Sequence, residues 1–325
     1  MKNKQNNPTK KTTARDKYNT IVEDFIQKLE NNDTEPWTKS WSMNSSLPKN
    51  FDTGNAYNGM NILTLLSSGF KDSRWLTFNQ AKKLGGTIKK GSKSTPIFFM
   101  KPIEKSTINE KTGEEEKDQY FLMQSYNAFN IEQTENINYE PEIKQSNTNN
   151  PISDFIQTIG IDEFRGEPAY SPEHDVVFMP QASEFESEGE YYSTYFHELT
   201  HATGHKSRLD RLEKFKVFGD EKYAFEELIA ELGSAFLSME QGIEPNSKKQ
   251  AAYLQSWINA LKEKPQILYS AASQASKGVN YLNDIIATKN AIQLPEIKFE
   301  PINLTATKQV SMSYNKPKKI HSPQI

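Results

Sequence analysis

The sequence predicts an α+β protein in two parts, and three observations support this. Its 325 residues exceed the roughly 100–200 of a typical domain. Helix and hairpin patterns mix before residue 131, whereas residues 152–290 are mostly helical in pattern. The polar, Asn-rich segment 132–151 between them is typical of a linker. We therefore expect folded parts at 15–131 and 152–290, and disordered ends at 1–14 and 291–325.

The first part is predicted to combine helices with a β-hairpin. Apolar residues at helical spacing predict a helix over 16–30 (Ile21, Val22, Phe25, Ile26 and Leu29). Residues 36–58 hold many Pro, Gly and Asn residues and predict a long loop, and a short helix follows over Asn61–Ser68. Thr77 can cap another helix that Gly85 would end. The segments 95–103 and 119–131 predict hairpin strands, with the charged NEKTGEEEKD as their loop.

The second part is predicted to be mostly helical. A short helix over 152–159 and a strand at His174–Pro180 come first. Four longer helices follow, over 190–204, 221–241, 247–263 and 265–288. Gly204 and Gly242 are suited to end the first two of them.

Composition excludes several classes of protein. The chain contains no cysteine, which rules out disulfides, a cysteine nucleophile and cysteine-ligated zinc or iron–sulfur clusters. No segment approaches the roughly 18 apolar residues of a membrane span. The polar start MKNKQNNPTKKTTAR has no apolar stretch of the kind a secretory signal needs. We expect a cytoplasmic protein with no membrane partner.

The distribution of charged residues also divides the chain into two parts. Residues 1–105 carry a net charge of +9 and residues 106–325 a net charge of -12. Three of the four Trp residues, Trp37, Trp41 and Trp75, lie in the basic part. Such an asymmetry indicates that the two parts have different partners.

His197-Glu198-Leu199-Thr200-His201 matches the H-E-x-x-H pattern of zinc peptidases. Histidines four positions apart on a helix differ by about 40° around its axis, so both imidazoles can reach one metal ion. Glu198 can then act as general base towards water that the metal polarises. Two alternatives remain open, namely two incidental histidines on a solvated helix and a metal site without catalysis.

The third ligand must come from elsewhere in the chain. Glu227 on the next predicted helix would complete a His₂Glu site, with Glu231 four positions later to orient a histidine. Glu226 is the substitute ligand, and a solvated carboxylate is the alternative for each of the three. His205 lies about 12 Å along a continuous helix from His197, so it could ligate only if the chain turned at Gly204.

The basic first part has the residue types that single-stranded DNA binding needs, which are cations for the backbone and flat side chains for base stacking. Candidate platforms are Trp37, Trp41, Tyr57 and Trp75. Gly54 allows close backbone approach, and Asn61 offers amide hydrogen bonds. The basic cluster comprises Lys82, Lys83, Lys89, Lys90 and Lys93. Alternatively, Trp75 and Phe78 belong to the core, and Lys82 and Lys83 to a solvated helix face.

Motifs in both parts resemble the ArdC family of plasmid antirestriction proteins, whose first domain also begins some plasmid primases. In the first part these are Pro36-Trp37, TGNAYNGMN at 53–61, SRWLTF at 73–78, Gln80-Ala81 to Gly86, and KGSK at 90–93. In the second part they are Tyr170-Ser171-Pro172 to Pro180, HELTHATGH at 197–205 to Arg211, and Glu226 to Phe236. Ala202 departs from the family pattern, where a larger residue is common.

The resemblance implies an N-terminal α+β domain that binds single-stranded DNA, followed by a mostly helical, gluzincin-like metallopeptidase domain. It implies zinc as cofactor and protection of incoming plasmid or phage DNA from host restriction. Two rival hypotheses remain. One is a zinc peptidase whose basic part recognises a protein, such as a host restriction enzyme. The other is a DNA-coating protein with a purely structural zinc.

Overall fold

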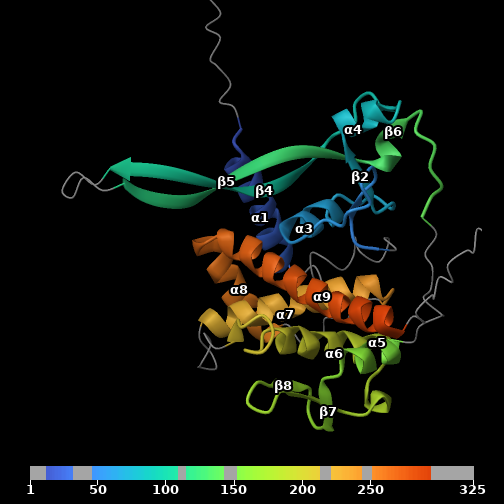
Figure 1. Cartoon of the computed structure of the whole chain (residues 1–325), viewed down its shortest axis with the longest axis vertical. Coiled ribbons are helices and arrows are strands. Elements are labelled where there is room, and N and C mark those ends of the chain that lie inside the picture. The colour runs from blue at the N-terminus through green and yellow to red at the C-terminus, as the bar shows by residue number, and fades with distance from the viewer. Residues whose placement is uncertain are drawn as a thin grey trace, which may run out of the picture.

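The computed structural model describes residues 12–31, 46–108, 115–142, 152–212, 221–243 and 251–293. It confirms the α+β prediction: a sheet with helices packs against a helical stack, and a small sheet lies at the far end of that stack (Figure 1). Within these ranges no helix is long and apolar enough to cross a membrane.

The first part is built on a four-stranded sheet in the order β1-β2-β5-β4, with β1 parallel to β2 and the other pairs antiparallel. Its strands are β1 (Lys49–Asn50), β2 (Arg74–Thr77), β4 (Thr95–Ile108) and β5 (Glu115–Asn130). A separate two-stranded sheet pairs β3 (Thr87–Ile88) with β6 (Thr134–Glu135).

The helices of the first part form largely where the sequence predicts them. α1 (Ala14–Glu30) starts at a capping box between Thr13 and Asp16 and buries its apolar stripe. α3 (Met60–Leu66) is buried along its whole length. α4 (Phe78–Lys83) begins at the predicted cap Thr77, which forms a second capping box with Gln80.

The β4–β5 hairpin is longer than predicted. Pairing continues to Ile108 opposite Glu115, so residues 115–118 belong to β5 and not to the expected loop. The reason is that the hydrogen-bonded ladder does not require apolar side chains, whereas the sequence argument ended each strand with its apolar residues.

Residues 132–142 of the predicted linker pack against the first part. A 3₁₀ helix at Ile131–Gln133 leads into β6. The Glu132 carboxylate accepts hydrogen bonds from the backbone N–H groups of Lys71 (2.9 Å) and Asp72 (2.7 Å). Glu142 forms an ion pair of 2.6 Å with Lys49. The polar composition of this segment therefore reflects side chains that bind neighbouring backbone.

The second part consists of helices and a three-stranded sheet. The helices are α5 (Ile152–Ile159), α6 (Glu188–Thr203), α7 (Glu221–Glu240), α8 (Ala251–Glu263) and α9 (Gln266–Gln293). The strands, in the order β7-β9-β8, are β7 (Asp162–Arg165), β8 (Ala169–Ser171) and β9 (Val176–Met179). A short 3₁₀ helix occupies Ala182–Glu184. The sequence indicated β9 but not β7 or β8, whose short segments carry no clear alternation.

The two parts share one hydrophobic core. Tyr18 and Phe98 of the first part belong to the same cluster as Phe236 and Leu268 of the second. The Tyr18 hydroxyl donates a hydrogen bond of 2.6 Å to the Pro265 carbonyl. The backbone N–H of Gly59 donates to the Ser276 hydroxyl of α9 at 2.7 Å. Sites in the two parts are therefore held on one packed body.

Candidate metal centre and candidate nucleic-acid groove

Helix α6 presents His197 and His201 on the side that faces α7. The helix starts at Ser187, whose hydroxyl accepts a hydrogen bond from the Glu190 backbone, and it buries Phe196 and Leu199 in the core. One turn separates the two histidines, and their Nε2 atoms lie 3.1 Å apart.

Glu227 of α7 completes a triangle of donor atoms. Its carboxylate oxygens lie 3.5 Å from the Nε2 atom of His197 and 3.5 Å from that of His201. Ligands at about 2.1 Å from a tetrahedral ion are separated by about 3.4 Å. The three side chains thus fit one face of a tetrahedral metal site, and their donor atoms all lie within 4.8 Å of one another.

Two further carboxylates of α7 hold the outer nitrogens of the imidazoles. Glu231 Oε1 lies 3.3 Å from His197 Nδ1, and Glu226 Oε1 lies 3.2 Å from His201 Nδ1. Arg211 in turn binds Glu226 through Nε at 2.9 Å and Nη2 at 2.9 Å. Carboxylates that bind the outer nitrogen are the usual means by which a metal-binding histidine is oriented.

The same carboxylates control protonation of the histidines. Burial lowers the histidine pKa values, but the carboxylates outweigh it, so the pKa of His201 rises to about 9 and that of His197 rises well above its ordinary value. Burial raises the pKa of Glu227, yet hydrogen bonds from both histidines bring it well below its usual range. Metal binding must therefore displace protons from the imidazoles.

A close approach of α6 and α7 makes this geometry possible. Gly233 of α7 lies against Thr200 of α6, and a Cβ atom at Gly233 would come within 2.4 Å of Thr200 Cγ2. A larger residue would push the helices apart and move Glu227 away from the histidines. In the sequence alone, Gly233 is only a residue of low helix propensity inside a predicted helix.

Two further predicted residues, Glu198 and His205, are not members of the triangle. Glu198 is 7% exposed, and its carboxylate makes no hydrogen bond or ion pair with any described residue. His205 lies beyond the end of α6, where its Nδ1 atom contacts the Ser207 hydroxyl (2.7 Å) and Asp175 (3.6 Å). The geometry therefore favours Glu227 over His205, Glu226 and Glu231 as third ligand, which stays a prediction.

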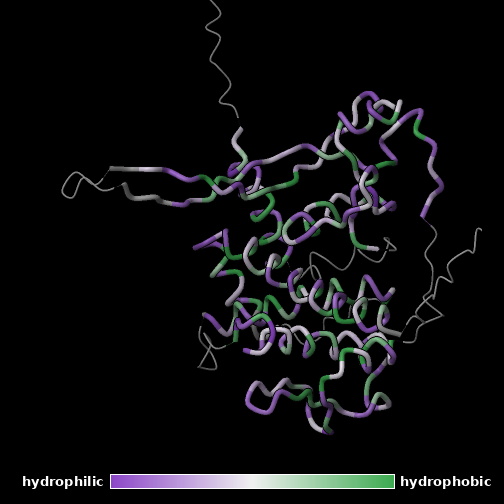
Figure 2. Tube along the Cα trace, viewed as in Figure 1, coloured by the Kyte–Doolittle hydropathy of each residue, from purple (hydrophilic) through white to green (hydrophobic). Residues whose placement is uncertain are grey.

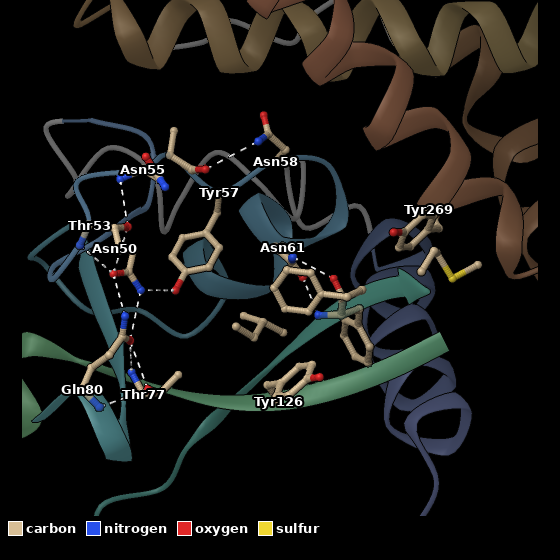
Figure 3. A pocket seen from close by; sticks show the side chains of 15 residues that line it. Asn50, Thr53, Asn55, Tyr57, Asn58, Asn61, Thr77, Gln80, Tyr126 and Tyr269 are labelled. Atoms are coloured by element: carbon tan, nitrogen blue, oxygen red, sulfur yellow. Dashed lines mark hydrogen bonds between the residues drawn. The ribbon is translucent and has the colours of Figure 1, made fainter. Parts of the chain in front are cut away.

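A groove of about 1000 Å³ lies in the first part, between the loop after β1, α3 and the β4–β5 hairpin. Figure 3 shows Tyr57, Asn61 and Tyr126 around this hollow, with Tyr269 of α9 at its far end. Among the residues that the structure describes, its lining contains no ionised side chain and is rich in amides and aromatics: Asn50, Thr53, Asn55, Ala56, Tyr57, Asn58, Asn61, Thr77, Gln80, Ile97, Phe98, Phe99, Met100, Tyr126 and Tyr269.

A network of amides fixes one wall of the groove. The Asn50 side chain donates to Tyr57 Oη at 3.3 Å and to Gln80 Oε1 at 3.2 Å. Its own oxygen accepts from the backbone of Asp52 (3.1 Å) and of Thr53 (3.0 Å). The loop can close this tightly because Gly54 has a φ of +73°, a conformation that suits glycine.

Exposed aromatic side chains form the opposite wall. Phe99 is 46% exposed and Tyr126 is 51% exposed, and their rings meet edge to face at 5.4 Å. Sequence reasoning missed both, because an aromatic residue in a strand pattern most often belongs to the core. The available signal was the adjacent pair Phe98 and Phe99. Neighbouring side chains of a strand point to opposite faces, so only one of the two can face the same core.

Two of the predicted DNA-binding residues have structural roles. Trp75 is 2% exposed and packs with Leu65 and Ile97, so it is a core residue and not a stacking platform. Asn61 is buried, and its amide pairs with the Phe98 backbone N–H (2.7 Å) and carbonyl (2.9 Å), which ties α3 to the edge of β4. Trp37 and Trp41 lie outside the described residues.

The predicted lysine cluster is exposed throughout, which is also what a solvated face would show. Lys83 forms an ion pair of 3.1 Å with Asp52, and Lys89 donates to the Glu132 carbonyl at 2.7 Å. Lys82, Lys90 and Lys93 make no such contact within the described ranges. Of the five, these three are the most available to a phosphate.

Two family models define the class of protein. A model described as zincin-like metallopeptidase matches residues 151–274, which include the His197–His201–Glu227 triangle. The model for the N-terminal domain of anti-restriction factor ArdC matches residues 15–129. The second part is thus a zincin-like domain, and such a domain implies a bound metal ion.

Crystal structures of the antirestriction protein ArdC from plasmid R388 are similar to this chain. The metal-free structure is 35% identical with a TM-score of 0.69, and it aligns over 83% of this chain and 98% of its own. The Mn(II)-bound structure is 33% identical with a TM-score of 0.67 and the same coverage. The chain belongs to the ArdC antirestriction family.

The chain also resembles part of a longer type of protein. Two Escherichia coli proteins named DNA primase TraC are each 34% identical to it over 285 and 282 residues, which are 82% and 79% of this chain. The chain spans only 20% and 26% of their lengths.

Proposed function

We propose that this protein binds single-stranded DNA in the groove of its first part and thereby protects incoming plasmid or phage DNA from host restriction. The observation that carries this proposal is a groove that combines exposed aromatic rings with amides and has no ionised side chain among its described lining residues. Flat side chains accept any base, because every base has a π-face on which they can stack.

Different residues in and beside the groove are suited to contact the bases and the phosphates. Phe99 and Tyr126 offer ring faces at the exposed wall. The Asn55 side chain is exposed and has no hydrogen-bond partner among the described residues, so its amide is available to a base edge. α4 supplies Gln80 to the lining and carries Lys82 and Lys83 in its last turn. Phosphates can therefore lie along the lysines while bases enter the groove.

Protection then follows from covering the DNA. Restriction enzymes act on duplex sites, and a strand held by protein cannot pair with its complement or be read. This mechanism needs no protein substrate, which is why we prefer it to cleavage of the restriction enzyme by the second part.

The groove is tested by removing its two exposed rings. A protein with Phe99→Ala and Tyr126→Ala should bind a fluorescent oligothymidylate at least about tenfold more weakly, since one base–aromatic stack contributes about 1–3 kcal/mol. Phe164→Ala in β7 is the control, because Phe164 is 55% exposed but lies in the second part. Equal affinities of all three proteins would exclude the groove as the DNA site.

A second activity, zinc-dependent peptide hydrolysis, is favoured by the His197–His201–Glu227 triangle. We propose that these three residues hold the ion, while Glu231 and Glu226 orient the imidazoles. A bound zinc ion would supply Lewis acidity towards a water molecule and a peptide carbonyl. Glu198, adjacent to His197 and buried, would accept the proton from the attacking water.

The identity of the metal is tested by titration. Calorimetry with Zn²⁺ and Mn²⁺ should show one site per chain with tighter zinc binding, because nitrogen-rich sites bind zinc more tightly than manganese. Tighter binding of Mn²⁺ would exclude zinc as the preferred ion and leave the ligand set unchanged.

A further inference from the structure

The β4–β5 hairpin extends beyond the groove and away from the body of the molecule (Figure 1). Directly opposed residues of an antiparallel pair project to the same side, and the side alternates along each strand. Tyr126, Phe99 and Ile97 line the groove from one side of the hairpin, and Phe98 and Met100 line it from the other side. We call the side that carries the two exposed rings, Tyr126 and Phe99, the groove-side face. Its register pairs are Ile97–Tyr126, Phe99–Gln124, Lys101–Leu122 and Ile103–Tyr120.

The groove-side face remains apolar and exposed after it leaves the groove. Leu122 is 47% exposed and Tyr120 is 49% exposed, and Lys101 is exposed between them along the face. Hydrophobic residues occur on both strands where the hairpin leaves the body (Figure 2). None of the four register pairs contains an acidic residue. Adjacent large apolar side chains in water usually indicate a binding surface.

We infer that the groove-side face continues the single-stranded DNA site, with Tyr120 as an outer stacking platform and Lys101 as a phosphate contact. This inference rests on the proposed DNA-binding function. Side chains two positions apart on one strand are separated by about 6.8 Å, twice the 3.4 Å spacing of nucleotides in one DNA strand. A strand at that spacing could therefore place two nucleotides beside each successive pair, and a strand extended to twice that spacing could place one.

The chemistry of the face favours DNA over a protein partner. Phe99 and Tyr126 belong to both the groove and the face, so a strand that leaves the groove meets the face without a gap. Tyr126 to Tyr120 covers about 20 Å.

Oligonucleotide length separates this face from the groove. The full chain with Tyr120→Ala should bind an oligothymidylate of ~16 nucleotides about tenfold more weakly and one of ~4 nucleotides normally, lengths that bracket common single-strand sites. Lys101→Ala should lower the salt dependence with the long strand by about 0.7. Phe121→Ala is the matched control, because Phe121 is 62% exposed on the opposite face of the same hairpin.

The outcomes distinguish the two proposals. Unchanged binding of the long strand by Tyr120→Ala, or an equal loss in Phe121→Ala, would overturn the track while leaving the groove intact. Loss of binding to both lengths only in the Phe99→Ala and Tyr126→Ala protein would also overturn the track. Failure of the unmodified protein to bind either strand would overturn the proposed function itself.

Discussion

The candidate metal centre and the candidate DNA groove differ in how they use charge. The metal centre gathers three carboxylates of α7 and two histidines of α6 into a partly buried network, with Arg211 behind it. The groove is open and its described lining residues are uncharged, with aromatic and amide side chains from segments far apart in the sequence. The comparison teaches that a site for a small cation needs short distances between charges, whereas a site for bases needs exposed flat surface.

This difference has a consequence for mutations. In the metal centre the loss of one partner leaves a buried charge without compensation, so effects should be large. In the groove each contact is separately solvated, and effects should be graded.

The largest effect is expected from His197→Ala combined with His201→Ala. Two of three ligands are then gone, and elemental analysis should find no bound metal. Oligothymidylate binding should persist, because the groove lies in the other part. Full metal occupancy in the double variant would show that the ion binds elsewhere.

The second largest effect is expected from Glu198→Gln, which keeps the shape of the side chain and removes the proposed general base. Metal content and DNA binding should be retained, while peptide turnover should fall about 10²-fold or more. We expect normal protection from restriction in cells, since covering DNA needs no hydrolysis. A variant that binds metal and DNA but gives no protection would show instead that cleavage is essential.

A smaller effect is expected from Glu231→Gln, which weakens the hydrogen bond to His197 Nδ1. Loss of such a contact typically lowers metal affinity 10–100-fold, and competition with a chelating dye would measure it. Glu240→Gln is the control on the same helix, because Glu240 binds Asn283 and not a histidine. Equal metal affinity of Glu231→Gln and the unmodified protein would remove Glu231 from the centre.

The smallest effect per residue is expected in the basic cluster. Replacing Lys82, Lys90 and Lys93 by Gln should weaken single-stranded DNA binding and reduce the slope of log K against log salt by about 0.7 per lost phosphate contact. Replacing Lys83 and Lys89 should do less, since both already have partners. An identical slope in the triple variant would move the phosphate path away from this cluster.

The sequence alone determined the features that depend on local spacing. The helical period of α1, the Thr77 capping box and the i, i+4 histidines follow from residues within a few positions of one another. It also indicated Glu227 and Glu231, because one helix carries both at a spacing that the His₂Glu chemistry requires.

Only the tertiary structure decided which side chains are accessible and which distant segments meet. Trp75 and Phe99 are both aromatic strand residues, yet one is 2% exposed and the other 46%. The close packing at Gly233, the contacts of Glu226 with His201 and Arg211, and the groove between loop, hairpin and α9 all depend on contacts between distant segments. Burial is a property of what packs against a residue, so residue type and spacing alone could not assign it.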